Sequence, residues 1–176
     1  MRIAYRCLAA SLVAAALSFL AISVTTTPAA ARNEISSFSG DVSPGTIVVR
    51  TNERRLYLVL GQGRALIYPV GVGRAGMQWE GRAVIASKRV RPAWGPPPSI
   101  KRENPRLPDV IPGGAPNNPM GVAALVLNGG DYAIHGTNNP SSIGRFSSHG
   151  CIRMYNEDIT DLYGRVGVGT PVVVTR

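Results

Sequence analysis

Cysteine, histidine and aromatic residues are scarce in this sequence. Its 176 residues include two cysteines, two histidines and 6% aromatic residues. Glycine and proline are plentiful by contrast, at 20 and 14 residues, so the composition favours a β-rich, turn-rich fold over a helical one. The length suits one modest globular domain, and the sequence contains no internal repeat.

Acidic residues are few as well. Ten stand against 19 lysines and arginines, which gives a formal net charge of +9. Such a basic balance indicates an anionic partner, for example a nucleic acid, an anionic lipid surface or a carboxylate-bearing polymer, although a solvated basic surface would give the same count. Because the sequence carries no nucleic-acid-binding motif, we do not expect a nucleic acid as the partner.

Residues 1–31 have the pattern of a secretory signal peptide. Two arginines precede an apolar run from Cys7 to Val24, and a segment of small residues ends at Ala31. This pattern predicts cleavage after Ala31 and export of the remainder. The apolar run approaches the roughly 20 residues that span a bilayer, so an uncleaved membrane anchor is the alternative.

Cleavage would leave Cys151 as the only cysteine of the mature chain. Exported proteins usually hold their cysteines in disulfide pairs, and this one has no partner. A buried, inert cysteine is one interpretation. The polar flanks, Ser-Ser-His-Gly before the cysteine and Ile-Arg after it, favour a functional thiol instead.

The body of the chain reads as a series of strands followed by one helix. Residues 32–44 are polar and small and are expected to form a flexible lead-in to a domain at 45–176. Asn156 is the predicted N-cap of the helix, and Gly167 its predicted end. The strands are predicted at 47–49, 56–60, 65–68, 81–86, 123–127, 132–135 and 170–175. The apolar face of the helix is predicted to consist of Ile159, Leu162, Tyr163 and Val166.

The segment from Arg91 to Pro119 is rich in proline and contains Trp94. Proline lacks a backbone N–H, so the segment is predicted to form neither a central strand nor a helix. We expect a long ordered loop. Loops of this length are often functional, so it is either a lid or wall of a substrate groove or a loop without such a role.

The candidate site lies between His135 and Arg153. Both histidines fall there, together with Cys151. A thiol attacks a carbonyl as thiolate, so a base must lie within hydrogen-bond reach. His135 follows directly from a predicted strand and is predicted to be the general base. His149 is predicted to position groups or bind substrate.

Acyl transfer also needs donors for an oxyanion and a partner for the imidazole. The amides of residues 149–151 are the predicted oxyanion donors, because Gly150 lets the backbone approach closely. Either the Asp131 carboxylate or a backbone carbonyl such as that of Gly136 would hold the second imidazole nitrogen. Arg153 is predicted to bind a substrate carboxylate, with a plain surface charge as the alternative.

Two other interpretations stay open at this point. His135, His149 and Cys151 are also ligand types for a catalytic zinc, although their spacing fits no zinc motif. A non-catalytic, basic module that binds cell-wall polymer is the second. Mutation of Cys151 separates both from an enzyme, since a zinc site would lose metal and a binding module would keep its affinity.

These motifs resemble the L,D-transpeptidase (YkuD-type) catalytic domain from about Gly45 to the C-terminus. The resemblance is carried by His135-Gly136-Thr and by Ser148-His149-Gly150-Cys151-Ile-Arg153, followed by Asn156-Glu-Asp. Trp94-Gly-Pro-Pro-Pro, Glu103-Asn-Pro and Pro119-Met-Gly are similar to the loop of proteobacterial members. Gly95 departs from that pattern, since arginine usually follows the tryptophan there.

The resemblance implies a mostly β, single sandwich-like domain with one or two short helices, located in the periplasm. It implies that Cys151 attacks the third residue of a peptidoglycan stem, typically diaminopimelate, and releases D-Ala. The acyl group would pass to another stem or to a lysine of an outer-membrane lipoprotein, or to water in a carboxypeptidase. No metal or other cofactor is implied, and carbapenems acylate the cysteine of many members. Positioning roles fall to Ser148, His149, Gly150 and Gly136, and substrate binding to Arg153, Trp94 and Asn138.

Overall fold

The computed structural model describes residues 34–176. The predicted signal peptide at 1–31 and its cleavage site therefore lie outside the described residues. None of the helices within 34–176 has the length and apolar character needed to cross a bilayer. The fold is mostly β, as predicted, and contains two α-helices.

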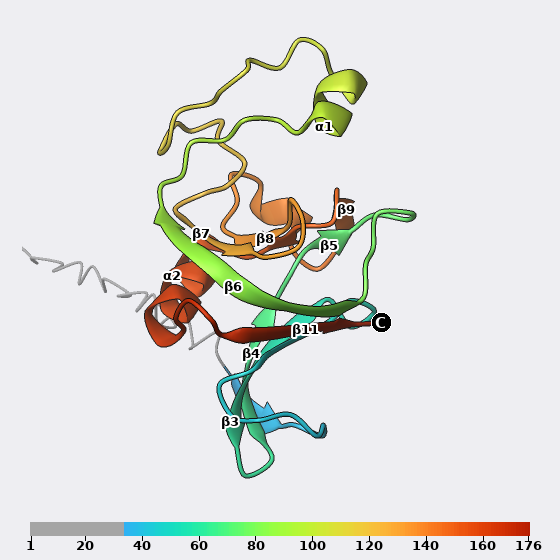
Figure 1. The fold of residues 1–176 in the computed structure, drawn as a ribbon, viewed down its shortest axis with the longest axis vertical. Coiled ribbons are helices and arrows are strands. Elements are labelled where there is room, and N and C mark those ends of the chain that lie inside the picture. Colours follow the sequence, from blue (N-terminus) through green and yellow to red (C-terminus); the bar gives the residue numbers. More distant parts are fainter. Residues whose placement is uncertain (1–33) are drawn as a thin grey trace, which may run out of the picture. The chain divides into compact units, whose positions relative to one another are not determined.

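Nine strands form one continuous sheet in the order β1-β4-β3-β2-β11-β6-β7-β8-β10 (Figure 1). The remaining two strands, β5 (Val72–Gly73) and β9 (Phe146–Ser148), form a separate parallel pair. The strands of the large sheet are β1 (Glu34–Ser37), β2 (Ile47–Arg50), β3 (Arg55–Gly61), β4 (Arg64–Pro69), β6 (Gly81–Val90), β7 (Ala123–Leu127), β8 (Ala133–His135), β10 (Ile152–Arg153) and β11 (Pro171–Thr175).

The long strand β6 joins the two halves of this sheet. Its first residues, from Gly81 to Val84, pair with β11, and its remaining residues pair with β7. The register shifts between Ile85 and Ser87, a bulge that bends a strand and increases its twist. Buried residues of both halves belong to one apolar cluster. The predicted sandwich is therefore formed by one sheet. Its two halves are joined by β6 and pack against each other through this apolar cluster.

The core explains which way each strand presents its side chains. Leu125, Ile134 and Ile152 are fully or almost fully buried in the same cluster as Ile47 and Leu56 of the other half. Successive residues of a strand point to opposite faces. The alternate residues of β7, β8 and β10 therefore face away from the core, and they are the ones that line the site described below.

The helix α2 (Asn156–Arg165) packs on this core through the predicted apolar face. Ile159 and Leu162 are fully buried, and Val166 and Tyr163 pack beside them. Burying one such side chain contributes about 1.5–3 kcal/mol of hydrophobic stabilisation. Lys88 of β6 donates to the carbonyls of Tyr163 (2.7 Å) and Val166 (2.6 Å) and so satisfies backbone acceptors at the end of the helix.

Asn156 is not the N-cap that the sequence suggested. Tyr155 holds that position, and Asn156 is the first residue of the helix. The Oδ1 atom of Asn156 instead accepts hydrogen bonds from the amides of Thr137 (3.1 Å) and Val122 (3.4 Å). Its side chain therefore fixes the chain just beyond β8 rather than its own helix. The helix also ends at Arg165, two residues before Gly167.

The predicted strands are confirmed, but four short ones were not predicted. These are β1, β5, β9 and β10, each of two to four residues. β1 pairs with β4 over residues 34–37. That part of the predicted flexible lead-in at 32–44 is therefore a strand, formed through backbone pairing at the edge of the sheet.

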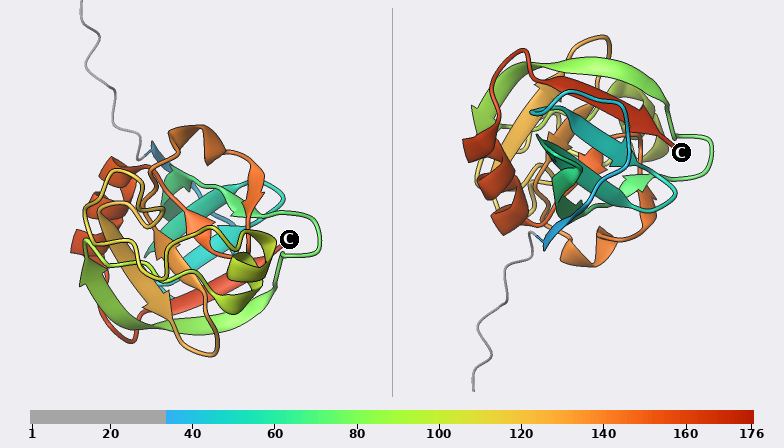
Figure 2. Two further views of the ribbon diagram at one scale, coloured as in Figure 1. Left: turned by 90° about the horizontal axis from the view of Figure 1, so that it is seen from above. Right: turned by 90° about the horizontal axis from the view of Figure 1, so that it is seen from below.

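The segment 91–119 contains a helix that the proline content seemed to exclude. α1 (Pro98–Glu103) begins with Pro98, and a proline is tolerated there because the first helical residues have no intrahelical partner for an N–H. The rest is irregular, as predicted. Figures 1 and 2 place the segment over β7 and β8.

The side chain of Asn118 connects separate parts of this segment through hydrogen bonds. Its side chain is 2% exposed. Its Nδ2 group donates to the carbonyls of Pro92 (2.9 Å) and Pro112 (2.9 Å), and its Oδ1 atom accepts from the amide of Met120 (2.8 Å). Prolines have no backbone N–H to donate, so this segment makes few backbone pairs, such as that between Trp94 and Ile111, and the buried amide of Asn118 adds to them.

Replacement of Asn118 by alanine should therefore loosen the whole segment. The change removes the hydrogen bonds to the buried carbonyl of Pro92 and the amide of Met120, at a cost of about 1–3 kcal/mol. We expect a lower free energy of unfolding in urea and faster amide hydrogen exchange across 91–119. The matched control is Asn117→Ala, because Asn117 is exposed; equal exchange rates in the two variants would contradict this role.

Candidate active site

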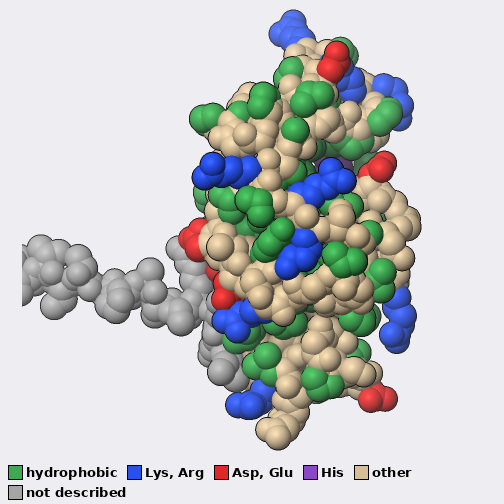
Figure 3. Space-filling model, turned by 60° about the vertical axis from the view of Figure 1, so that its left-hand side comes forward, with side chains coloured by type: hydrophobic (Ala, Val, Ile, Leu, Met, Phe, Trp, Pro, Cys, Tyr) green, Lys and Arg blue, Asp and Glu red, His purple; other side chains and the backbone are tan. Residues whose placement is uncertain are grey.

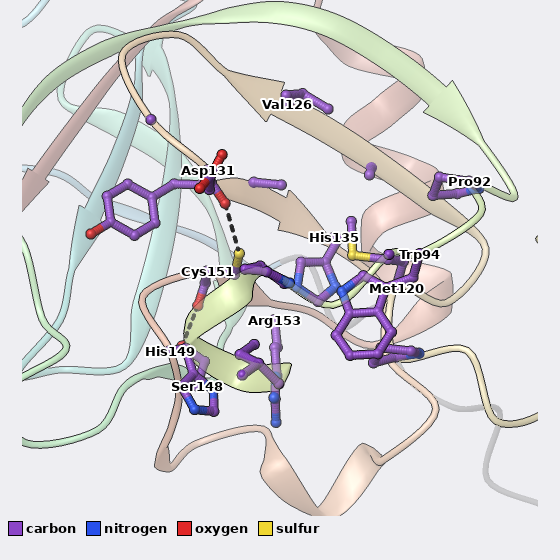
Figure 4. Close-up of a pocket in the computed structure, with 18 of the residues that line it drawn as sticks. Pro92, Trp94, Met120, Val126, Asp131, His135, Ser148, His149, Cys151 and Arg153 are labelled. Atoms are coloured by element: carbon purple, nitrogen blue, oxygen red, sulfur yellow. Dashed lines mark hydrogen bonds between the residues drawn. The ribbon is translucent and has the colours of Figure 1, made fainter. Parts of the chain in front are cut away.

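A cavity of about 840 Å³ lies between the Pro-rich segment and the face of the sheet that turns away from the core. Trp94 and Met120 contribute to its apolar wall, and Ala124 and Val126 of β7 line it from the sheet (Figure 4). Figure 3 shows the hollow below that segment, bordered by basic side chains. The segment 91–119 therefore forms one wall of this cavity.

The strand register brings the predicted residues to this cavity. β8 and β10 are parallel neighbours, with His135 opposite Arg153 and Ile134 opposite Ile152. The isoleucines enter the core, so His135 and Arg153 point the other way. Cys151 lies two residues before Arg153, and all three polar residues line the cavity.

His135 is held in one orientation by the neighbouring backbone. Its Nδ1 atom lies 2.6 Å from the carbonyl oxygen of Gly136, so Nδ1–H donates and Nε2 remains as the proton acceptor. The ring is only 4% exposed. Burial lowers the pKa of His135 to about 4, an effect that the Gly136 hydrogen bond opposes and the Arg153 charge reinforces. Two hydrogen-bond partners were predicted for the second imidazole nitrogen. The Gly136 carbonyl takes this place, and the Asp131 carboxylate does not.

Cys151 is an unpaired, partly buried thiol. Its Sγ atom lies 3.8 Å from the carbonyl oxygen of Asp131 as a weak donor. Burial raises the pKa of the Cys151 thiol; the Ala133 backbone and the Arg153 charge oppose this, and the Asp131 charge adds to it. Since burial also lowers the pKa of His135, the resting pair consists of a neutral thiol and a neutral imidazole.

The turn before Cys151 is fixed by contacts on both sides. The buried Ser148 hydroxyl donates to the carbonyl of Cys151 (2.6 Å) and accepts from the amide of Gly150 (3.1 Å). Gly150 has φ of +116°, and a Cβ atom there would lie 2.4 Å from the ring of Tyr132. Trp79 stacks on that ring and donates to the Gly150 carbonyl (3.0 Å). Only glycine fits this position.

These contacts correct one part of the predicted oxyanion site. The Gly150 amide already donates to Ser148, so it is not a free donor for a substrate oxygen. Of the three predicted amides, those of His149 and Cys151 remain as candidates. Gly150 instead acts on the shape of the turn, which is the positioning role that the sequence also suggested.

His149 is bound to the Pro-rich segment rather than to the thiol. Its Nε2 atom lies 2.9 Å from Oε2 of Glu103 at the end of α1. The other oxygen of Glu103 accepts from Arg74 at 2.6 Å. The hydrogen bond with His149, followed by that with Arg74, lowers the pKa of Glu103. Glu103 thereby ties α1 to the turn before Cys151, although exposed ion pairs of this kind add little stability.

Arg153 lies in the cavity without a carboxylate partner among the ion pairs of residues 34–176. The side chain is partly buried, and this burial lowers the pKa of its guanidinium. Asn138, predicted to bind substrate, is exposed and does not line the cavity. The chain turns outward after Thr137, so Asn138 faces solvent instead.

Several residues of the site carried no sequence signal. Tyr132 and Trp79 support the turn from a distance of 18 or more positions along the chain, and Glu103 reaches it from the Pro-rich segment. Of these three residues, only Glu103 belongs to a motif named in the sequence analysis, Glu103-Asn-Pro. Within the described residues, no group of three or more His, Cys, Asp or Glu side chains is arranged to hold a metal ion.

A family model described as the L,D-transpeptidase catalytic domain matches residues 44–174. The chain belongs to the L,D-transpeptidase family. A protein of Escherichia coli K12 named as the probable L,D-transpeptidase ErfK/SrfK is 40% identical over 135 residues, which are 73% of this chain and 43% of that protein. This chain thus matches less than half the length of its E. coli relative. A Fuscovulum blasticum protein, named "Putative L,D-transpeptidase in ATP synthase subunits region ORF 5", is 36% identical over 175 residues, which are 94% of this chain and 92% of that protein.

Solved L,D-transpeptidases share the fold. L,D-transpeptidase 3 of Mycobacterium tuberculosis, in complex with a faropenem-derived adduct, has a TM-score of 0.58 at 19% identity over 74% of this chain and 60% of its own. The catalytic domain of the E. faecium L,D-transpeptidase acylated by ertapenem has a TM-score of 0.58 at 19% identity, over 77% of this chain and all of that one. At such identities the likeness shows the fold alone.

The protonation of His135 can be measured directly. Because burial holds its pKa near 4, the ring should stay neutral, with the proton on Nδ1, from neutral pH down to about pH 4. Imidazole ¹⁵N shifts followed from pH 8 to pH 3 should show this, with His149→Gln to assign the two rings. A midpoint near 6.5 for His135 would contradict the buried, desolvated geometry.

Proposed function

We propose that this chain is a peptidoglycan L,D-transpeptidase with Cys151 as the nucleophile and His135 as the general base. The proposal is carried by one observation: both residues line one cavity together with Arg153, which lies opposite His135 on the neighbouring strand and has no ion-pair partner in the described chain. Family membership supports the reaction type. The donor is a tetrapeptide stem whose third residue, typically diaminopimelate, carries the scissile carbonyl.

The first half-reaction transfers the acyl group to sulfur. Nε2 of His135 takes the proton of the Cys151 thiol as Sγ bonds to the carbonyl carbon. Since the resting pair is neutral, the proton moves during the attack and no standing thiolate is needed. The tetrahedral intermediate then breaks its C–N bond, and the imidazolium returns the proton to the departing amine of D-Ala.

The oxyanion of that intermediate requires backbone donors. The amides of Cys151 and His149 are the proposed donors, because the Gly150 amide is already used by Ser148. Loss of one oxyanion donor typically costs about 3 kcal/mol of barrier. The contacts of Ser148, Trp79 and Tyr132 therefore act on the rate by holding this turn, and not by touching the substrate.

The second half-reaction passes the acyl group to an amine. His135, neutral again, accepts a proton from the incoming amine as its nitrogen bonds to the thioester carbonyl; the C–S bond breaks and the sulfur is reprotonated. The amine belongs to another stem or to a lysine of an outer-membrane lipoprotein. Water in the same place would give a carboxypeptidase.

Substrate recognition is assigned to two sides of the cavity. Arg153 binds a carboxylate of the stem through its guanidinium, which is partly desolvated and has no ion-pair partner in the described chain. Trp94 and the Pro-rich segment contact the apolar parts of the peptide. The proposed location is the periplasm, where a peptidoglycan substrate lies and where the predicted signal peptide would deliver the chain.

The proposal predicts D-Ala release from a disaccharide-tetrapeptide, read by mass spectrometry with and without an amine acceptor. Cys151→Ala should abolish release, and His135→Asn should slow it by about 10²–10⁴-fold, the usual contribution of a general base. His149→Asn is the matched control and should retain much more activity, since His149 contacts Glu103. The absence of D-Ala release from the wild-type chain would overturn the proposal, and equal losses in the two histidine variants would overturn the choice of base.

A further inference from the structure

Asp131 lies next to the thiol, on the side away from Arg153. It belongs to the turn between β7 and β8, and its carbonyl accepts from Sγ of Cys151 at 3.8 Å. In Figure 4, Asp131 and Arg153 lie on opposite sides of Cys151. Asp131 is exposed and lines the cavity. The sulfur therefore stands between one positive and one negative side chain.

The carboxylate of Asp131 has no basic partner among the ion pairs of residues 34–176, in a chain where such pairs are common. Basic residues outnumber acidic ones by 19 to 10. Five other carboxylates of the described chain pair with basic side chains, namely those of Glu53, Glu80, Glu103, Asp109 and Asp161. An exposed carboxylate that lines the cavity and has no ion-pair partner in the described chain is available to an incoming cation.

The Asp131 carboxylate also opposes ionisation of the Cys151 thiol in the first half-reaction. Its negative charge adds to the burial that raises the pKa of the Cys151 thiol. A bound cation would remove that effect, because it would neutralise the charge beside the sulfur. The arrangement disfavours formation of the Cys151 thiolate, and it favours a site that takes up a positive group during turnover.

We propose that Asp131 binds the ammonium group of the acyl acceptor and directs it to the thioester on Cys151, on the side opposite the carboxylate site at Arg153. This inference rests on the proposed function. The acceptor class it names is a primary alkylamine that is protonated at neutral pH, such as a stem amine or a lysine side chain. Water, which carries no charge, gains nothing from Asp131.

The protons of this step balance through His135 and solvent. The ammonium group at Asp131 loses its first proton to solvent, because an imidazole with a pKa near 4 does not take a proton from an alkylammonium. The neutral amine then bonds to the thioester carbonyl and gives its second proton to Nε2 of His135, which is neutral after it has protonated the departing D-Ala, as the C–S bond breaks. The Cys151 thiolate takes the proton from the His135 imidazolium, so that both residues return to their neutral forms.

The test measures the ratio of two products of the acyl-enzyme, the adduct with the amine and the tripeptide formed by hydrolysis. The donor is the disaccharide-tetrapeptide, and the acceptors are Nα-acetyl-lysine amide, which is cationic, and hydroxylamine, which is uncharged at neutral pH. Because both products come from one acyl-enzyme, their ratio does not depend on the rate of acylation. Asp131→Asn should lower the ratio of lysine adduct to tripeptide roughly three- to tenfold, as expected for a partly exposed charged contact. The ratio with hydroxylamine should not change.

Two further variants separate charge from folding. Asp131→Glu keeps the carboxylate and should restore most of the preference for the cationic acceptor. Asp41→Asn removes an exposed carboxylate remote from the cavity lining and should leave both ratios as in the wild type. Thermal unfolding midpoints within a few degrees of the wild type would show that each variant is folded.

The outcomes separate this inference from the function on which it rests. Equal ratios in the wild type and Asp131→Asn, or an equal loss with both acceptors, would overturn the role of Asp131 while D-Ala release still supports the transpeptidase. A wild-type chain that releases no D-Ala would overturn the proposed function and this inference together.

Discussion

The parallel pairing of β8 with β10 is the constraint on which the rest of this site depends. It sets Ile134 beside Ile152 and His135 beside Arg153. Because side chains alternate along a strand, burying the isoleucines in the core turns the imidazole and the guanidinium into the cavity. A slip of one residue would place the polar groups in the core, so hydrophobic packing itself holds the register of the site. Asn156 adds to this by fixing the chain that leaves β8.

Burial has a second consequence, because it controls the charge state of the site. The same desolvation that lowers the pKa of His135 raises the pKa of Cys151, so the free protein holds an uncharged pair. This arrangement protects the unpaired Cys151 of the described chain, since the thiolate is the form that oxidises. In the proposed mechanism the charges appear only when a substrate carbonyl is in place and nearby amides can share the negative charge.

The sequence predicted the strands and the helix face well, because both depend on local periodicity. It also grouped His135, Cys151 and Arg153, which lie in one contiguous motif and line the same cavity, and it named the Gly136 carbonyl as one of two partners for the His135 ring. It failed where the reason was not local. The short β5, β9 and β10 form by pairing with distant chain, Asn156 bonds across to Thr137 instead of capping its helix, and α1 tolerates proline at its start. The Gly150 amide was assigned to an oxyanion because its partner, the Ser148 hydroxyl, cannot be read from spacing.

The most direct test of the central claim is the mass of the intermediate itself. The chain is mixed with the disaccharide-tetrapeptide, quenched in acid within seconds and digested, and the adduct is located by tandem mass spectrometry. The account predicts an acyl group, equal to the substrate minus D-Ala, on the sulfur of Cys151, and its accumulation only while His135 is intact. Release of D-Ala with the acyl group on another residue, or with no covalent intermediate at any quench time, would contradict it.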